Sequence, residues 1–378
     1  MKVAIFTDSF LPGIGGTENA VLRYAVSLAE TDEVMVVAPN YHKKNDDGSY
    51  PFKVVRFKSL PVTGNDMWAM PALSFKAKKA IDKFAPDIIH CQHWGMTCGY
   101  AAKYAKKHGV PLLFVIHTKF DYCYKHAFGS FSPIPFFMIK NGVRRLKKAD
   151  AVCTVSYAMS KTLDSYGYKK PVTVIKNGVN RNNFNAEKRK KATDDPFVFL
   201  FVGLIISYKN IAFSLRALAE VKKVRNDFTF YLVGKGPHVK KFKRLAAKLK
   251  LSDNVVFTGP ITDRIVLSEK YAQADLFLFP SVFDNDGLVI MEAAANGTPS
   301  LVLKNTGSAE RITDGESGFF SEPTEKAYAE KILYLMEHRN QLYCISDGGK
   351  MPEYAPWIDT VKEYKKLYAS LLADRAGE

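Results

Sequence analysis

Short apolar runs alternate with helix-forming segments along most of this chain. Residues 3–6, 112–116 and 276–279 are examples of the runs, and the first leads into a glycine-rich turn. Uniformly apolar runs of this length are typical of strands buried on both faces of a parallel sheet. The alternation therefore predicts a doubly wound α/β architecture, in which ligands bind at the carboxyl ends of the strands.

The alternation occurs in two series, and a polar stretch separates them. Residues 181–196 are rich in Asn, Lys, Arg and Asp, which is typical of a linker. This boundary predicts one domain at 1–180 and another at 197–353. In the last segment, 354–378, apolar side chains recur at helical spacing and predict a terminal helix.

Composition narrows the class of protein. Hydrophobic residues make up 47% of the 378 positions, so each domain can bury a core. No apolar run is long enough to cross a bilayer, and the N-terminus enters a strand without a signal peptide. The five cysteines are odd in number and form no Cys-x-x-Cys pair, which is typical of a reducing compartment. We therefore expect a cytoplasmic protein without a disulfide or zinc framework.

The formal charge of +16 predicts an anionic partner, although a generally lysine-rich surface would give the same total. Residues 119–148 combine aromatic side chains with clustered Lys and Arg, and only Asp121 offsets these charges. Such a segment can rest on an anionic bilayer surface. It could also bind nucleic acid, or form an ordinary helix with Val143 and Leu146 inward and its lysines in water.

The stretch from residue 276 to residue 298 carries the strongest functional signal. The apolar run 276–279 predicts a buried strand, and residues 288–295 are rich in helix formers. A strand, a tight turn and a helix N-terminus leave backbone N–H groups unpaired, and these groups can bind a phosphate. The residues that would present them are Asn285, Asp286, Gly287 and Leu288.

Two carboxylates frame this turn, Asp284 before the helix and Glu292 just over one turn inside it. A nucleotide diphosphate-sugar could span them, with its pyrophosphate on the helix N-terminus, its sugar near Asp284 and its ribose hydroxyls on Glu292. The spacing equally fits a simpler structure, in which Asp284 only caps the helix and Glu292 is solvated. The acidic triplet 284–286 could also bind a metal, but its place at a helix start argues against this, and we expect no metal site.

The same stretch resembles the signature of the family-4 retaining glycosyltransferases, in which two Glu residues separated by seven positions precede Ala and Gly-Thr-Pro. Here Asp284 and Glu292 are separated by seven residues and Gly297-Thr298-Pro299 follows, but the first acid is one methylene shorter than Glu. The resemblance covers nearly the whole chain. It implies the GT-B fold, in which two Rossmann-like domains face a central cleft and the last helix crosses back to the N-terminal domain. It also implies transfer of a hexose with retention at the anomeric carbon.

The resemblance assigns roles to further residues. Lys209, which follows a strand and Gly203, matches a cation that neutralises the leaving pyrophosphate, although its position equally fits a surface lysine. The family usually carries Arg one residue after this glycine, where this chain has Leu204. His117 matches a histidine thought to touch the outer hydroxyl of the donor sugar, although a lone histidine is more often structural. Gly15, Gly16 and Thr258 also match donor-binding positions of the family, and Gly234, in a glycine-rich turn at the end of a strand, is a further candidate for donor binding.

We expect UDP-glucose as the donor and GDP-mannose as the second choice, although no feature of the sequence indicates which nucleotide base is bound. Residues 119–148 favour a membrane glycolipid or diacylglycerol as the acceptor, and a soluble saccharide is the alternative. The departures at Leu204 and Asp284 also permit a non-catalytic binder of nucleotide-sugars. The expected protein is a glycosyltransferase at the inner face of the cell membrane, which uses no cofactor besides its donor and binds no nucleic acid.

Overall fold

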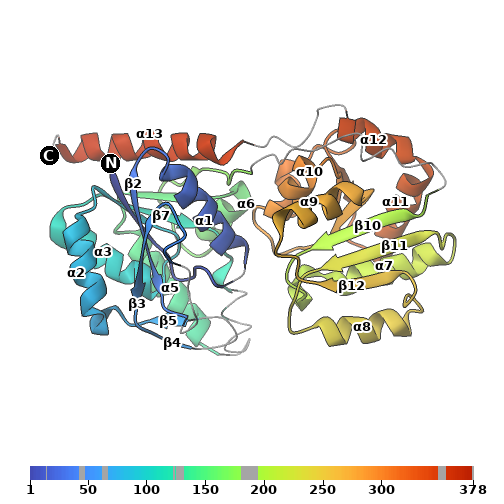
Figure 1. The fold of residues 1–378 in the computed structure, drawn as a ribbon, viewed down its shortest axis with the longest axis horizontal. Coiled ribbons are helices and arrows are strands. Elements are labelled where there is room, and N and C mark those ends of the chain that lie inside the picture. Colours follow the sequence, from blue (N-terminus) through green and yellow to red (C-terminus); the bar gives the residue numbers. More distant parts are fainter. Residues whose placement is uncertain are drawn as a thin grey trace. The chain divides into compact units, whose positions relative to one another are not determined.

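The computed structural model describes residues 1–13, 15–41, 47–61, 67–121, 124, 132–179, 195–347 and 355–376. The chain forms two compact units, shown in Figure 1. Met1–Gly178 and Trp357–Glu378 make up the N-terminal unit, and Val179–Pro356 make up the C-terminal unit. Each unit contains a parallel sheet whose strands alternate with helices along the chain, which confirms the predicted doubly wound architecture.

The sheet of the N-terminal unit has the strand order β3-β2-β1-β6-β7-β8-β9, and all its pairings are parallel. Because β2 and β6 lie on opposite sides of β1, the strand order reverses there, and the loops after β1 and β6 meet at the ligand-binding edge of such sheets. The strands are β1 (Lys2–Phe6), β2 (Glu33–Pro39), β3 (Lys53–Phe57), β6 (Ile88–Cys91), β7 (Leu112–Ile116), β8 (Ala151–Thr154) and β9 (Thr173–Val174).

The helices of this unit differ from the sequence expectations mainly at their ends. The sequence predicts the first helix at 19–30, but it begins at Gly16, because Gly15 already has the extended backbone of an N-cap. The helix predicted near 72–84 is divided by Ser74 into a 3-10 turn and an α-helix. A small antiparallel hairpin was not predicted. These elements are α1 (Gly16–Leu28), β4 (Ser59–Pro61), β5 (Met67–Ala69), η1 (Pro71–Leu73), α2 (Phe75–Phe84), α3 (Met96–His108), α5 (Ile134–Leu146) and α6 (Tyr157–Ser165).

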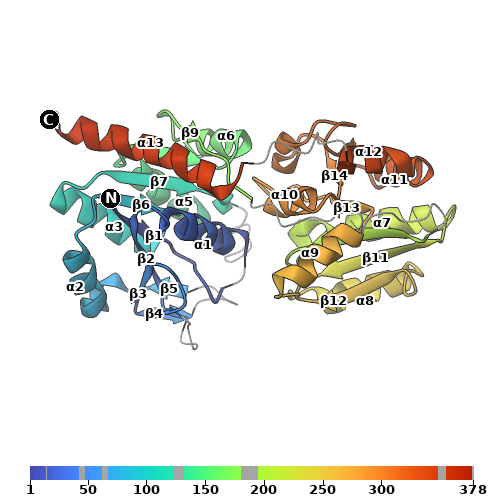
Figure 2. The same ribbon diagram turned by 45° about the horizontal axis from the view of Figure 1, so that its top comes forward.

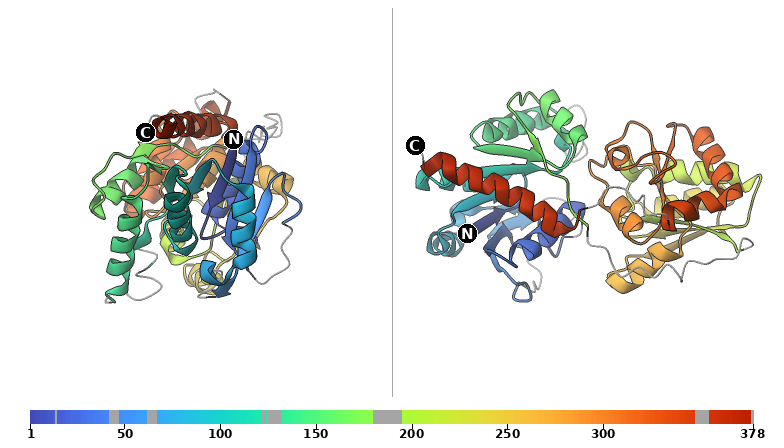
Figure 3. Two further views of the ribbon diagram at one scale, coloured as in Figure 1. Left: turned by 90° about the vertical axis from the view of Figure 1, so that its left-hand side faces the viewer. Right: turned by 90° about the horizontal axis from the view of Figure 1, so that it is seen from above.

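The C-terminal helix α13 (Trp357–Ala376) belongs to the N-terminal unit, as the predicted fold requires, and lies beside α1 (Figures 2 and 3). Its Lys365 ammonium is 2.7 Å from Oδ2 of Asp32, and its Thr360 hydroxyl donates to the carbonyl of Lys176 at 3.1 Å. The helix also buries Tyr368 completely against the sheet. These contacts make α13 a structural part of the unit that carries His117.

The sheet of the C-terminal unit has the order β12-β11-β10-β13-β14-β15, again with parallel pairings. Its order reverses between β10 and β13. The strands are β10 (Phe197–Val202), β11 (Phe228–Val233), β12 (Val255–Gly259), β13 (Leu276–Phe279), β14 (Ser300–Leu303) and β15 (Phe319–Ser321). The helices are η3 (Ser207–Lys209), α7 (Ile211–Lys222), α8 (Val239–Lys248), α9 (Arg264–Gln273), α10 (Leu288–Ala295), η4 (Gly307–Arg311), α11 (Glu325–Glu337) and α12 (Arg339–Asp347).

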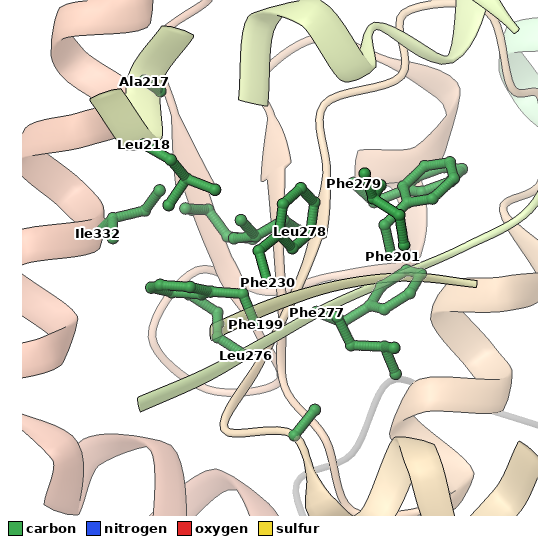
Figure 4. Packing of buried hydrophobic residues seen from close by; sticks show 14 of the residues in the cluster. Phe199, Phe201, Ala217, Leu218, Phe230, Leu276, Phe277, Leu278, Phe279 and Ile332 are labelled. Atoms are coloured by element: carbon green, nitrogen blue, oxygen red, sulfur yellow. The ribbon is translucent and has the colours of Figure 1, made fainter. Parts of the chain in front are cut away.

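Aromatic side chains of adjacent strands fill the core of this unit (Figure 4). The ring of Phe279 lies 6.0 Å from that of Phe201 on β10 and 5.7 Å from that of Phe277 on its own strand. Leu218 of α7 and Ile332 of α11 close the core from the helix layer. Burial of each such side chain contributes about 1.5–3 kcal/mol, so β10 and β13 form a rigid base for the loops that follow them.

Candidate functional site

The loops after β10 and β13 lie at the point where the strand order of the C-terminal sheet reverses. Lys209, the last residue of η3, comes from the first loop, and Asp284 comes from the second. The Lys209 ammonium lies 2.5 Å from Oδ1 of Asp284, and 5.4 Å from the centre of the Phe279 ring. Only 15% of the lysine side chain is exposed, so the surface-lysine interpretation does not describe it. The sequence match and the fold therefore bring a cation and a carboxylate to the ligand-binding edge.

The two carboxylate oxygens of Asp284 differ in their surroundings. The second of these atoms, Oδ2, is buried and has no hydrogen-bond partner among the described residues. A buried acceptor without a partner is unfavourable, and a ligand hydroxyl would satisfy it. The alternative in which Asp284 only caps α10 is wrong, because the N-cap is Gly287, in a left-handed conformation with φ of 60°.

The turn before α10 is held in place by a buried ion pair. Arg311 of η4 donates to Oδ1 of Asp286 from Nε at 2.8 Å and from Nη2 at 2.5 Å, and both side chains are less than 10% exposed. A Cβ atom at Gly307 would lie 2.5 Å from the carbonyl oxygen of Asp284, so η4 packs directly against the turn. This packing fixes the backbone of Asn285, Asp286, Gly287 and Leu288, whose N–H groups the sequence predicts to bind phosphate.

Two ion pairs also surround the acidic triplet for which the sequence left a metal-binding alternative open. The carboxylates of Asp284 and Asp286 each have a cationic partner, Lys209 and Arg311. Within the described part of the chain, no three His, Cys, Asp or Glu side chains gather where they could hold a metal ion. The charges at this turn are thus balanced by protein cations.

Glu292 lies on the side of α10 that faces α9. Arg264 donates to its Oε1 at 3.3 Å, and the hydroxyl of Tyr271 donates to its Oε2 at 3.1 Å. Its side chain is 29% exposed, so the solvated alternative describes it only in part. Two donors from one helix hold the carboxylate in a fixed orientation while leaving it accessible.

The glycine turns bring the strand ends close together. Gly234 has a φ of 143°, and a Cβ atom there would lie 1.9 Å from the carbonyl oxygen of Gly203. Only glycine fits this crossing of the loops after β10 and β11. At the end of β12, the Thr258 hydroxyl donates to the carbonyls of Leu232 and Gly259, at 3.3 and 2.9 Å. The hydroxyl proton of Thr258 is therefore engaged within the protein.

The predicted residues of the N-terminal unit follow the carboxyl ends of β1 and β7 in its sheet. Gly15 and Gly16 form the start of α1, and a Cβ atom at Gly16 would meet open space. His117 follows β7, and its Nε2 donates to Oε1 of Gln92 at 2.5 Å. Burial lowers the pKa of His117 to about 3, so its imidazole is neutral at physiological pH.

The segment 119–148 combines features of two of its sequence interpretations. Val143 and Leu146 of α5 are buried, as in an ordinary helix, but Phe136 and Phe137 at its other end are each 63% exposed. The Lys140 ammonium lies 5.7 Å from the centre of the Phe136 ring. Residues 122–123 and 125–131 lie outside the described residues. Among the helices that are described, none has the length and apolar character needed to span a bilayer.

Sequence reasoning did not identify several residues that support the site. Arg311 and Tyr271 act through contacts with residues more than 20 positions away, and neither belongs to a recognisable motif. His90, on β6, bonds to Gln92, and Tyr368, on the C-terminal helix, bonds to His90. A polar residue in a buried strand, such as His90, is the one signal that could have drawn attention to this group.

Two family models match consecutive parts of the chain. The model described as Glycosyltransferase Family 4 matches residues 14–183, and the model described as Glycosyl transferases group 1 matches residues 183–350. Together they include every residue of the donor-site prediction.

The names of curated relatives with similar sequences differ in the sugar that they specify. An α-monoglucosyldiacylglycerol synthase of Streptococcus pneumoniae is 26% identical over 332 residues, which cover 83% of this chain and 74% of the relative. A GDP-mannose-dependent α-mannosyltransferase of Corynebacterium glutamicum is also 26% identical, over 389 residues that cover 99% of this chain and 90% of the relative.

Solved structures share the fold at lower sequence identity. HepE of Anabaena in complex with UDP has a TM-score of 0.77 and 19% identity, covering 98% of this chain and 100% of that chain. Sucrose-phosphate synthase of Thermosynechococcus elongatus has a TM-score of 0.79 and 19% identity, covering 99% of each chain. The solved structures show the shared GT-B fold, and the two family models together show that the chain is a glycosyltransferase with a family-4 region followed by a group-1 region.

Proposed function

We propose that this glycosyltransferase moves a hexose from a nucleotide diphosphate-sugar to an acceptor hydroxyl with retention at the anomeric carbon. The observation that carries the proposal is the Lys209–Asp284 pair, placed where the order of the C-terminal sheet reverses and beside the start of α10. In the transfer, the bond between the anomeric carbon and the phosphate oxygen breaks. The acceptor oxygen attacks the same face of the sugar and gives its proton to the departing diphosphate.

The protein contributes charge to this step. Negative charge grows on the diphosphate as the bond breaks, and the Lys209 ammonium and the N-terminus of α10 stabilise it there. Oδ2 of Asp284, buried without a described partner, would accept a hydrogen bond from a sugar hydroxyl. No protein nucleophile is required, and Lys209 and the helix start take the place that a metal ion holds in other transferases.

The donor that we propose is UDP-glucose, with GDP-mannose as the second choice. HepE, which has a similar fold, was crystallised with UDP and with UDP-glucose. The curated relatives include both a glucosyldiacylglycerol synthase and an enzyme named for GDP-mannose. In the proposed pose Glu292 binds the ribose, and Gly203, Gly234 and the Thr258 backbone surround the diphosphate and the base.

The experiment that tests the donor is a thermal-shift screen of UDP- and GDP-sugars, followed by an assay of nucleotide release. We expect UDP-glucose to raise the melting temperature and to yield UDP above the background rate. Binding of GDP but not of UDP would replace the donor with GDP-mannose. Stabilisation without nucleotide release, in the presence of a range of acceptors, would favour the non-catalytic alternative that Leu204 permits.

For the acceptor we propose a membrane glycolipid or diacylglycerol, reached by peripheral binding to the inner face of the cell membrane. The exposed rings of Phe136 and Phe137, next to Lys140, support this choice, because aromatic and basic side chains together favour an anionic bilayer surface. Flotation with liposomes that contain anionic lipid tests it. We expect the wild type to float and Phe136→Ser/Phe137→Ser to remain in solution. A wild type that does not float would direct the search to soluble saccharides.

A further inference from the structure

A continuous series of hydrogen bonds connects the C-terminal helix to His117 within the N-terminal unit. The hydroxyl of Tyr368, on α13, bonds to Nδ1 of His90 at 2.5 Å and to the hydroxyl of Tyr24, on α1. Nε2 of Gln92 donates to Nε2 of His90 at 2.8 Å, and Oε1 of Gln92 is 2.5 Å from Nε2 of His117. We refer to these five side chains, Tyr24, Tyr368, His90, Gln92 and His117, as the relay.

The amide of Gln92 determines where the protons of both imidazoles lie. An amide has one donor end and one acceptor end, so the two rings that face it must play opposite roles. Because the amide nitrogen donates to His90, Nε2 of His90 carries no proton, and its Nδ1–H donates to Tyr368. Because the amide oxygen accepts from His117, the proton of that ring is on Nε2.

Burial excludes water from the relay and holds its rings in place. His90 and Tyr368 have no exposed surface, and Gln92 and Tyr24 are at most 3% exposed. The rings of Tyr24 and Tyr364 each lie 5.0 Å from the His90 ring, which fixes its orientation. Burial lowers the pKa of His90 and of His117 to about 3, so both rings are neutral at physiological pH. A reversed arrangement would require every donor in the series to turn at once.

We propose that Gln92, His90 and Tyr368 are positioning residues that fix His117 as the tautomer protonated on Nε2, so that its Nδ1 is the nitrogen that accepts a hydrogen bond from a substrate hydroxyl. A neutral ring with an acceptor nitrogen selects a hydroxyl group and not an anion. The relay also makes the docking of α13 a condition for the correct state of His117. The proposal rests on the proposed function, with His117 contacting a hydroxyl of the donor sugar as its family match implies, but the tautomer exists without substrate.

The direct test is nitrogen NMR of the full chain with ¹⁵N-labelled histidine, in which the His117 signals are identified by their loss in His117→Asn. The chemical shifts of the two ring nitrogens report which of them carries the proton. We expect His117 to be protonated on Nε2 and His90 on Nδ1. Protonation of His117 on Nδ1, or rapid exchange between both forms, would overturn the proposal. This result does not depend on activity, so it remains informative if no nucleotide release is detected.

Two variants test whether the relay is the cause. Tyr368→Phe keeps the ring and removes the hydroxyl, and Gln92→Met keeps the shape of the side chain and removes both hydrogen bonds. For each we expect a mixture of His117 tautomers and a kcat lower by roughly tenfold or more, with little change in KM for the donor.

Tyr364→Phe is the matched control, because it keeps the ring that packs against His90 and removes a hydroxyl of α13 that forms no hydrogen bond with the five relay side chains. We expect it to leave the His117 signals and kcat unchanged. Wild-type tautomer and wild-type kcat in both Tyr368→Phe and Gln92→Met would contradict the positioning role. Equal losses in Tyr364→Phe would assign the effect to the packing of α13.

Discussion

The ammonium of Lys209 and the carboxylate of Asp284 lie 2.5 Å apart although 75 positions separate them in the chain. The pair joins the loop after β10 to the loop after β13. These two strands are adjacent in the sheet, and the strand order reverses between them. When no donor is bound, Asp284 compensates the charge of Lys209. A diphosphate that binds at the start of α10 would compete with Asp284 for the same ammonium. The charge of Lys209 is then balanced by Asp284 before the donor binds and by the diphosphate during transfer.

Replacement of Lys209 by Met, which keeps the length of the side chain without its charge, should slow transfer more than it weakens donor binding. The charge on the leaving phosphate grows in the transition state, so the lost interaction acts mainly there. We expect kcat to fall by about 10²–10³-fold, as for other single transition-state donors, with a change of only a few fold in KM for the donor. Steady-state kinetics of nucleotide release measures both. Lys209→Arg, which keeps the charge, should retain more activity than Lys209→Met.

Glu292→Ala should weaken nucleotide binding without preventing folding, because the side chain is partly exposed and its partner Arg264 can return to water. We expect Kd for UDP to rise about tenfold, or about 1.4 kcal/mol, in isothermal titration. Glu292→Gln keeps an acceptor for Tyr271 and should bind with intermediate affinity. Glu325→Ala, which removes an exposed ion pair with Arg216 in the same unit, is the control. An unchanged Kd in Glu292→Ala would remove this residue from the donor site.

Arg311→Met should destabilise the C-terminal unit, because it leaves the Asp286 carboxylate buried without its partner. Loss of one member of a buried pair costs about 3–5 kcal/mol, whereas replacement of both by apolar groups is often nearly neutral. We therefore expect Asp286→Leu/Arg311→Met to recover most of the stability. Urea unfolding by circular dichroism follows both units, and fluorescence isolates the N-terminal unit, which contains all three tryptophans. A double variant as unstable as Arg311→Met would contradict the ion-pair explanation.

The N-terminal unit should lose stability as the pH falls below about 6.5. Burial lowers the pKa of His90 and His117 to about 3, and that of His93 is also lowered, from an ordinary value of 6.5. Between these values the unfolded chain binds more protons than the folded chain, so acid favours unfolding by up to about 1.4 kcal/mol per pH unit for each histidine. Tryptophan fluorescence during thermal unfolding at pH 4.5–7.5 measures the slope. In His117→Asn, the slope of stability against pH should fall by the contribution of one histidine. An unchanged slope would show that His117 is not held neutral by the fold.

Much of the fold could be predicted from local patterns. The runs at 276–279 and 288–295 coincide with β13 and α10, because a fully apolar strand and a segment of helix formers leave little choice of structure. The structure of the turn between them could not be predicted from local patterns. The spacing alone allowed Asp284 to be a helix cap, and only the left-handed backbone of Gly287 excludes it.

The supporting contacts could not be predicted, because they depend on which distant segments become neighbours. Arg311 neutralises Asp286 only because η4 packs against the turn after β13, and the sequence around Arg311 contains no motif that indicates this. Tyr368 reaches His90 across 278 positions, and the helical spacing of its segment predicts a buried face but not what that face contacts. Local pattern thus predicts the elements, and tertiary packing decides the electrostatics of the site.

The start of α10 and the Lys209 ammonium should together hold the diphosphate of a sugar nucleotide. This binding mode can be observed in a crystal of the full chain soaked with UDP-glucose. We expect density for the diphosphate at the first backbone N–H groups of α10, within hydrogen-bonding distance of Nζ of Lys209. Density for the nucleotide at another place, with this position empty, would show that this binding mode is wrong.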